Sequence, residues 1–189
     1  MTFPGRRGTE IPLLYFSAKF FEDWGYDKIF VAQPPDSEED FDRAYSHAKE
    51  LLEGICFQEY RNIVFVGKSR GTVLACKLKE SLKLPASLIL LTPIEATLPY
   101  MTRDNDILLA VCGSKDRYLS CELLREVCLR ENISCYIEEG AGHCMEVRAD
   151  LDRDLEIIRN VMLAFYTFWQ KRSNKGKYTG DNIISMRFS

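Results

Sequence analysis

The sequence has few histidines, no closely paired cysteines and no long apolar run, and each shortage excludes a class of protein. Only His47 and His143 could supply imidazole, and no CxxC pair occurs, so a zinc cluster of ordinary spacing cannot be assembled. Uninterrupted apolar runs reach only about six residues, as in 107–112, against the ~20 that a bilayer requires. We therefore expect no transmembrane helix, no membrane partner, no metal and no cofactor.

Charge and cysteine usage restrict the possible binding partners and the cellular compartment. The 25 Lys and Arg side chains stand against 28 Asp and Glu, a formal charge of −3, which offers no general electrostatic basis for binding nucleic acid. Seven cysteines, an odd number, are scattered through segments typical of helices and strands and are predicted to be free thiols. Arg6 and Arg7 precede no apolar core of the kind an export signal needs. We expect a cytoplasmic protein.

The length of 189 residues and the 46% apolar content fit one domain with one sizeable core. We place that domain at residues 1–172 and a polar, mobile tail at 173–189. Short β-branched runs alternate with segments of helical period, which is typical of a parallel sheet covered by helices. The predicted strands are 27–33, 62–67, 87–91, 106–112 and 133–137, and the predicted helices are 12–24, 41–55, 71–83, 119–130 and 151–170.

Between a predicted buried strand and a predicted helix lies the run Gly67-Lys68-Ser69-Arg70-Gly71. It has the pattern G-x-S-x-G, in which glycines permit a sharp turn that holds the serine hydroxyl out at the carboxyl edge of the sheet. The pattern alone occurs by chance in roughly one sequence in 25 of this composition. The strand before it and the helix after it make it far more specific.

A serine hydroxyl needs a base to remove its proton, and the base needs an acid to orient it. Asp116 follows one predicted strand and His143 follows the next, so both belong at the edge of the sheet where Ser69 is expected. The chain order is Ser, Asp, His.

With these three motifs in this order, the sequence resembles the α/β-hydrolase superfamily over nearly its whole length. The resemblance implies a three-layer αβα sandwich with a mostly parallel sheet of about six strands, lacking the first two strands and the lid of larger members. It implies a catalytic triad in which Ser69 is the nucleophile, His143 the general base and Asp116 its orienting acid. It also implies an oxyanion hole of two backbone N–H groups, from Arg70 and from Arg6 in the loop Phe3-Pro4-Gly5-Arg6.

Plainer roles remain open for the same residues. Ser69 could be an ordinary helix N-cap, and Asp116 could cap the helix predicted to begin at Leu119. His143 could be an ordinary loop histidine. Cys144 beside it invites a thiol mechanism, although no nucleophile turn surrounds it. A phosphate-binding P-loop is excluded, because Asn62 stands where that motif needs glycine.

Cationic residues are frequent in the loops expected at the catalytic edge of an otherwise acidic chain. We hypothesise that they form a rim that favours an acyl substrate bearing a carboxylate or phosphate. The rim comprises Arg6, Arg7, Lys68, Arg70, Lys115 and Arg117. Among the substrate-binding candidates Arg7, Lys68, Glu95, Tyr100 and Arg117, Glu95 would be a counter-charge and Tyr100 a wall of the site.

The predicted function is a serine hydrolase that cleaves a small or surface-accessible ester or thioester through an acyl-enzyme. About fourteen residues separate the strands that end at Leu91 and begin at Asp106, too few for an inserted helical lid, so the site should be open. The alternative is a catalytically inactive hydrolase-like binding or scaffold protein. The partner would be a small-molecule ester, and the chain a monomer or a homodimer.

The front of the sequence is short for such a fold. The strand leading to Gly5, which the fold places centrally, has only Met1 to Phe3, about 10 Å at ~3.3 Å per residue. We expect either a half-length central strand or a start that lies upstream of Met1.

Overall fold

The computed structural model describes residues 12–26, 28–31, 41–173 and 183–188. Their strands form one sheet in the order β1-β6-β2-β3-β4-β5, and every neighbouring pair is parallel. The strands are β1 (Lys28–Val31), β2 (Asn62–Lys68), β3 (Ala86–Leu91), β4 (Ile107–Gly113), β5 (Cys135–Glu138) and β6 (Ile183–Phe188). A parallel sheet of about six strands is therefore confirmed.

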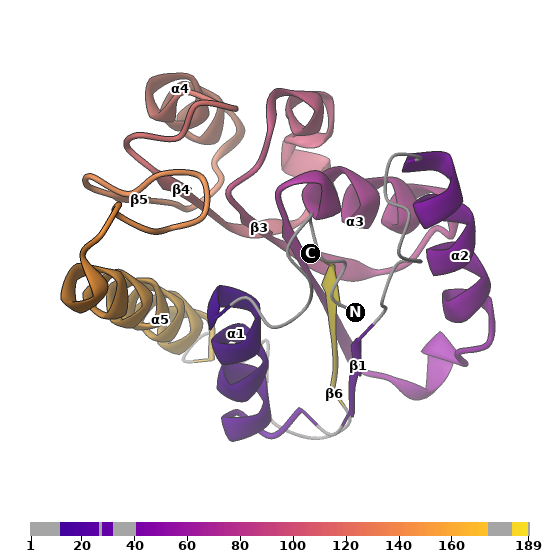
Figure 1. The fold of residues 1–189 in the computed structure, drawn as a ribbon. Helices are drawn as coiled ribbons and strands as arrows, with labels where there is room; N and C mark the ends of the chain where they lie inside the picture. The colour runs from indigo at the N-terminus through magenta and orange to yellow at the C-terminus, as the bar shows by residue number, and fades with distance from the viewer. Residues whose placement is uncertain (1–11, 27, 32–40, 174–182, 189) are drawn as a thin grey trace.

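Helices cover both faces of this sheet, as Figure 1 shows. One face carries α1 (Pro12–Asp23) and α5 (Leu151–Ser173). The other carries α2 (Phe41–Glu53), α3 (Arg70–Ser81) and α4 (Cys121–Glu131). The three-layer αβα arrangement agrees with the expected fold class. None of the helices in these described ranges is long and apolar enough to span a bilayer.

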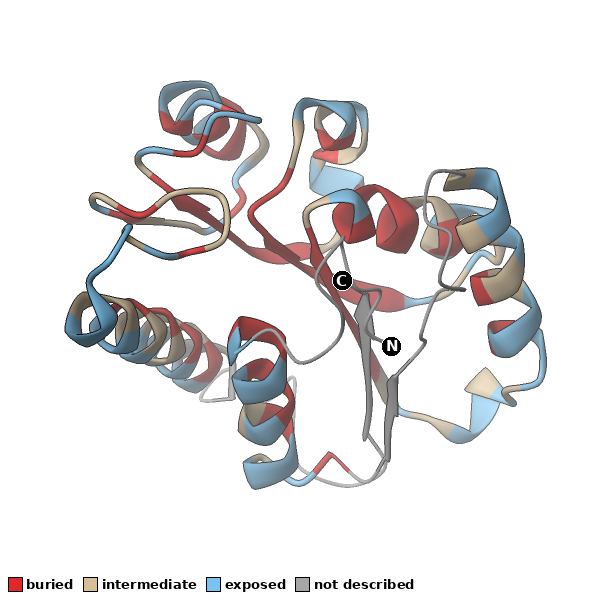
Figure 2. Cartoon of the chain, viewed as in Figure 1, coloured by how far each residue is buried: buried red, intermediate tan, exposed pale blue. Residues whose placement is uncertain are grey.

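The strands supply both halves of the core because successive side chains point to opposite faces. Along β2, Ile63 and Phe65 pack with α2, α3 and α4, while Val64 and Val66 pack with α1 and α5. Figure 2 shows β2, β3 and β4 as buried strands, and the helices are exposed on their outer sides. Such strands are apolar without alternation, which is why the sequence marked them clearly.

The end of the chain differs from expectation. Ile183–Phe188, predicted to lie in a mobile polar tail, form a strand that pairs with β1 on one side and β2 on the other. Helix α5 also continues to Ser173 rather than ending at Gln170. The tail prediction was wrong for this segment because pairing with β1 and β2 depends on residues more than 100 positions away. The stub from Met1 to Phe3 lies outside the described residues.

The connection from β3 to β4 consists of two short 3₁₀ turns, Glu95–Tyr100 and Arg103–Asn105. It carries no inserted helical domain, in agreement with the expected lidless arrangement. The first turn is attached to the loop after β4, because the N–H of Glu95 donates to the carbonyl of Tyr118 at 3.3 Å. The carboxyl edge of the sheet is therefore bordered here by a tight loop.

Candidate active site

Ser69 occupies the sharp turn between β2 and α3. Its backbone has φ 55° and ψ −124°, a conformation that L-residues rarely adopt and that places the side chain outward from the turn. The turn is tight enough that a Cβ on Gly67 would lie 2.6 Å from the carbonyl oxygen of Gly71. The Ser69 N–H donates to the carbonyl of Leu91 at 2.9 Å, which ties the turn to the end of β3.

Three side chains from separate loops form one hydrogen-bonded chain at this edge. His143 Nε2 lies 2.7 Å from Ser69 Oγ, and His143 Nδ1 lies 2.8 Å from Asp116 Oδ2. The Asp116 side chain is fully buried and that of His143 is 15% exposed. The structure thus brings together all three residues that the sequence singled out for the triad.

The Asp116 carboxylate is held by hydrogen bonds on both oxygens. Oδ1 accepts from the backbone N–H of Tyr118 at 2.9 Å, while Oδ2 faces His143. Asp116 is not a helix cap: α4 begins at Cys121, and the hydroxyl of Ser120 accepts from the N–H of Leu123 at its start. The alternative structural role considered for Asp116 is therefore wrong.

A buried thiol lies beneath the same carboxylate. Cys112 Sγ is 3.9 Å from Asp116 Oδ2. Burial, followed by the nearby negative charge of Asp116, raises the pKa of the Cys112 thiol to about 12. The thiol consequently stays protonated near neutral pH and presents no competing charge to the carboxylate.

The loop that carries His143 is pressed against the end of β4. A Cβ on Gly113 would lie 2.2 Å from the carbonyl oxygen of Ala141, so only glycine permits this approach. The same carbonyl accepts from the N–H of Lys115 at 2.9 Å. The acid loop and the histidine loop are thereby held together through their backbones as well as through Asp116 and His143.

Helix α5 braces the histidine loop from the other side. The buried carboxylate of Glu138, at the end of β5, accepts from Arg153 at 2.7 Å and from Asn160 at 3.2 Å. Asp154 Oδ1 accepts from the N–H of Val147 at 2.6 Å. These contacts attach the first turns of α5 to both ends of the loop that contains His143.

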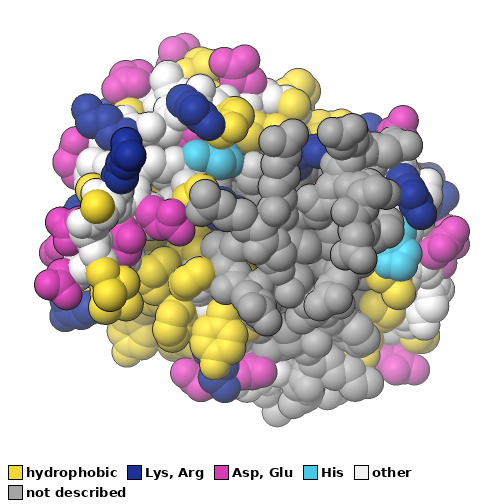
Figure 3. All heavy atoms as spheres, in the orientation of Figure 1, with side chains coloured by type: hydrophobic (Ala, Val, Ile, Leu, Met, Phe, Trp, Pro, Cys, Tyr) yellow, Lys and Arg dark blue, Asp and Glu magenta, His cyan; other side chains and the backbone are white. Residues whose placement is uncertain are grey.

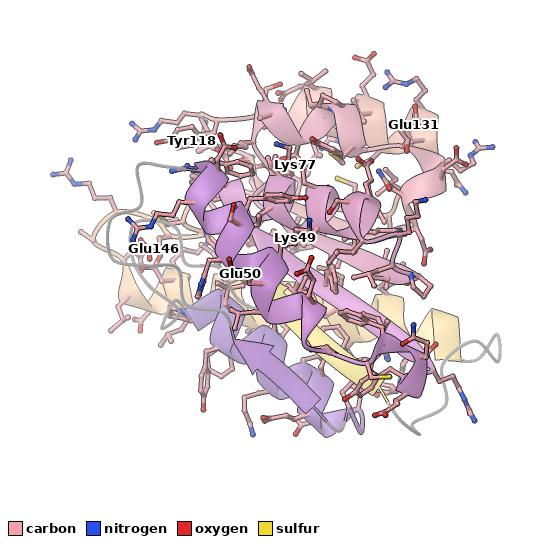
Figure 4. The ribbon with its side chains drawn as sticks, turned by 90° about the vertical axis from the view of Figure 1, so that its right-hand side faces the viewer. Lys49, Glu50, Lys77, Tyr118, Glu131 and Glu146 are labelled. Atoms are coloured by element: carbon pink, nitrogen blue, oxygen red, sulfur yellow. The ribbon has the colours of Figure 1, made fainter. Side chains whose placement is uncertain are left out.

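Tyr118 is a site residue that the sequence analysis missed. Its ring centroid lies 4.5 Å from that of His143, and the residue is 47% exposed. Arg117 lies over the Tyr118 ring at 5.2 Å and donates to its hydroxyl at 3.3 Å. Figure 4 shows Tyr118 and Glu146 on one side of the molecule, opposite Glu131 at the end of α4. The sequence signal that could have identified Tyr118 is its position, an aromatic residue two places after Asp116.

The structure places some of the other predicted site residues close to the triad and others away from it. Arg117 is exposed beside the triad, and Glu95, the first residue of a 3₁₀ turn, donates its N–H to the Tyr118 carbonyl. Arg70, the first residue of α3, directly follows Ser69 and is exposed. Arg6 and Arg7 lie outside the described residues.

Two of the predicted substrate-binding residues point elsewhere. Lys68 is only 4% exposed, so its side chain does not lie on a solvent-facing rim. Tyr100 packs against the core beneath α2, α3 and α4, and burial together with nearby Glu80 raises its pKa. Glu80 belongs to the last turns of α3, whereas Ser69 lies at the opposite end. Neither residue fits the substrate-facing role expected for it.

Two exposed cations nevertheless lie beside the site. In Figure 3, Lys and Arg side chains (dark blue) over the region of β4, β5 and α4 are interspersed with Asp and Glu side chains (magenta). Lys115 and Arg117, in the acid loop, are both exposed.

Within the described ranges 12–26, 28–31, 41–173 and 183–188, no group of three His, Cys, Asp or Glu side chains could hold a metal ion.

Comparison with solved structures identifies the fold. The chain is similar to an alpha-beta serine hydrolase homologue from Coxiella burnetii, with 17% identity, a TM-score of 0.55 and coverage of 80% of this chain and 77% of that one. It is also similar to a protein from Xanthomonas campestris proposed to be a hydrolase of the alpha/beta superfamily. There the identity is 16% and the TM-score 0.56, over 86% of this chain and 96% of that one.

No protein family model matches the sequence, and no curated protein matches it significantly. The two solved structures show that the protein has the fold of the α/β-hydrolase superfamily. Among the described residues, the connection from β3 to β4 carries no inserted lid domain. The resemblance stated from the three sequence motifs is confirmed at the level of fold.

Proposed function

We propose that this protein is a serine hydrolase that cleaves an ester or thioester through an acyl-enzyme. The observation that carries the proposal is the continuous hydrogen-bonded chain from Ser69 Oγ through His143 to Asp116. It occurs at a strained strand-to-helix turn, in a fold whose solved neighbours are described as hydrolases. The same three groups have separate roles in the reaction, set by their positions.

In the first half of the reaction, Ser69 Oγ attacks the carbonyl carbon of the substrate while His143 Nε2 takes the hydroxyl proton. Asp116 accepts a hydrogen bond from Nδ1, which holds the tautomer with a free Nε2 lone pair and then stabilises the imidazolium. As the tetrahedral intermediate collapses, the bond to the alcohol or thiol breaks, and His143 returns the proton to that leaving group. The acyl group remains on Ser69.

In the second half, His143 removes a proton from water, and the resulting hydroxide attacks the acyl carbon. The second tetrahedral intermediate releases the carboxylic acid as Ser69 Oγ recovers its proton from His143. The oxyanion of each intermediate would receive the backbone N–H of Arg70, at the N-terminus of α3, where the helix dipole also favours negative charge. Arg6 is the proposed second donor. Each such donor is worth about 3 to 4 kcal/mol.

The substrate class we propose is a short acyl ester or thioester, or an ester on a larger molecule, that carries a negative charge. The 3₁₀ turns between β3 and β4 leave the Tyr118 and His143 rings partly exposed rather than enclosed. The exposed cations of Lys115 and Arg117, in the acid loop, and of Arg70, the first residue of α3, flank the triad. They would attract an anionic group through solvent, an effect that salt weakens.

The decisive experiment is labelling with a fluorophosphonate probe, which bonds covalently to an activated serine. We expect intact mass spectrometry to find one adduct, located at Ser69, and none in Ser69→Ala. Ser134→Ala, a change at an exposed serine before β5, is the matched control and should be labelled like the wild type. An unlabelled wild type would overturn the proposal in favour of an inactive binding or scaffold protein.

The substrate class is tested separately with p-nitrophenyl esters and acyl thioesters that differ in length and charge. We expect kcat/KM to be at least about tenfold higher for anionic substrates at low salt, and the preference to shrink at 0.5 M NaCl. Equal kcat/KM for neutral and anionic substrates, unaffected by salt, would contradict the anionic preference and leave the serine mechanism standing.

A further inference from the structure

Lys68 is a buried cation next to the candidate nucleophile. It ends β2, directly before Ser69, and is 4% exposed. Its ammonium donates to Thr92 Oγ1 at 3.3 Å and to the backbone carbonyl of His143 at 3.2 Å. Burying an ammonium costs several kcal/mol unless hydrogen bonds compensate. The two hydrogen bonds of Lys68 therefore offset a desolvation cost that an exposed lysine would not have.

The contacts of Lys68 link the end of β2 to two loops of the site, the one after β3 and the one that contains His143. Thr92 follows β3 and has φ 44°, an uncommon conformation for a β-branched residue, with its N–H donating to Val111 at 2.7 Å. The histidine loop is fastened to the acid loop through Ala141 and to α5 through Val147. The Lys68 contact adds an attachment to β2, the strand that leads into Ser69.

This attachment acts at the residue whose ring must be placed most accurately. The imidazole of His143 has to meet Ser69 at 2.7 Å and Asp116 at 2.8 Å at the same time. Its ring position follows its backbone, and Lys68 holds the backbone carbonyl of that very residue. A misplacement of about 1 Å in such an arrangement can cost 100-fold in rate.

We propose that Lys68 is a positioning residue that fixes His143 relative to Ser69, rather than a substrate-binding residue. The proposal rests on the serine-hydrolase function proposed above, because it assigns Lys68 to the same catalytic site. In this role the side chain holds the histidine loop against the strand that leads to the nucleophile, and it acts through the backbone of His143.

The test compares Lys68→Met, which keeps the unbranched stem and removes the donors, with Lys68→Arg, which keeps a charged donor. We expect Lys68→Met to lower kcat on a neutral p-nitrophenyl ester at least tenfold while KM stays within twofold. Lys68→Arg should recover at least a third of the lost activity. Lys83→Met, the same change at an exposed lysine after α3, is the matched control and should leave kcat unchanged.

A second readout requires no turnover. The proton between His143 Nδ1 and Asp116 should give a far-downfield ¹H NMR signal, assigned by its loss in Asp116→Asn. We expect this signal to broaden or disappear in Lys68→Met while the thermal unfolding transition stays cooperative, and to return in Lys68→Arg. An unaltered signal together with wild-type kcat in Lys68→Met would overturn the proposal.

Thr92→Val provides the test if Lys68→Met fails to fold. It has nearly the same shape, and it removes the oxygen through which the ammonium is held to the end of β3. We expect at least a twofold fall in kcat and a weaker downfield signal, and no change in either would overturn the proposal. If the wild type shows no fluorophosphonate labelling, the hydrolase proposal fails, and the NMR comparison still decides whether Lys68 positions His143.

Discussion

At the residue scale, the proposed chemistry depends on a carboxylate that is removed from water. The Asp116 side chain is fully buried, and its two oxygens face the Tyr118 N–H and His143 Nδ1. Such hydrogen bonds replace the water contacts that a buried carboxylate has lost, and they also fix its direction. Cys112, below it, adds a weak donor without adding charge.

Asp116→Asn tests the orienting role of this carboxylate. The amide has nearly the same shape but can donate to Nδ1, which favours the wrong imidazole tautomer for accepting the Ser69 proton. We expect kcat for ester hydrolysis to fall about 10³- to 10⁴-fold with little change in the thermal midpoint. Asp104→Asn, at an exposed position before β4, serves as the control, and equal activities in the two variants would contradict the role of Asp116.

We expect the buried thiol of Cys76 to make the free energy of unfolding depend on pH. Burial raises the pKa of its thiol from the ordinary 9.0 to about 12. Between these values the unfolded thiol loses a proton that the folded one retains, so the free energy of unfolding falls as pH rises. The decline is at most about 1.4 kcal/mol per pH unit for one thiol, and it is absent well below pH 9.

Urea unfolding at pH 7.5 and at pH 10 measures this effect. Cys76→Ala should lose less stability than the wild type between the two pH values, because the variant lacks the protected thiol. Cys56→Ala removes an exposed thiol and should behave like the wild type. Identical pH dependence in Cys76→Ala and the wild type would show that the Cys76 proton does not contribute.

At the scale of elements, the site depends on how closely the loops after β4 and β5 approach each other. The pairing of Gly113 with Glu138 sets the two strand ends side by side, and the Ser114 N–H donates to the Glu138 carbonyl at 2.9 Å. Gly113 then allows the Ala141 carbonyl to lie against it. The distance from Asp116 to His143 is therefore set by backbone contact between two loops.

Gly113→Ala tests this contact. The new Cβ would lie 2.2 Å from a backbone oxygen, so the histidine loop must move away from the acid loop. We expect the free energy of unfolding to fall by about 2 kcal/mol or more and kcat to fall at least tenfold. Gly54→Ala, where the nearest atom to the new Cβ is 3.8 Å away, is the matched control and should retain near-normal activity.

At the scale of the whole molecule, the sheet is completed by the last strand of the chain. β6 pairs over four residues with β1 and over six with β2, so β1 contacts the rest of the sheet through it. Figure 1 shows β6 between these strands, close to the middle of the molecule. Stability and the placement of the Ser69 strand are thereby coupled to the C-terminal residues.

A proline in β6 should disturb this arrangement. Ser185 is paired with Val64 on one side and Ile29 on the other, and proline there cannot donate a backbone hydrogen bond. We expect Ser185→Pro to lower the thermal midpoint by about 5 °C or more, whereas Ser185→Ala, which keeps the N–H, should change it little. Equal midpoints in the two variants, measured by circular dichroism, would contradict a paired β6.

The sequence alone was sufficient for features whose signal is local. The apolar runs of β2, β3 and β4 marked buried strands, and the glycines around Ser69 marked a sharp turn, since both patterns reflect constraints within a few residues. The positions of Asp116 and His143 after successive strands also placed them at one edge, because parallel strands share the direction of their carboxyl ends.

Only the tertiary structure decided where side chains at that edge point and which strands become neighbours. Lys68 looked like a surface cation but turns inward to His143, and Tyr118 went unnoticed although its ring lies beside that of His143. The Ile183–Phe188 segment resembled the end of a polar tail and became a strand between β1 and β2. Each of these outcomes depends on packing between residues far apart in the chain, whose energies no local pattern contains.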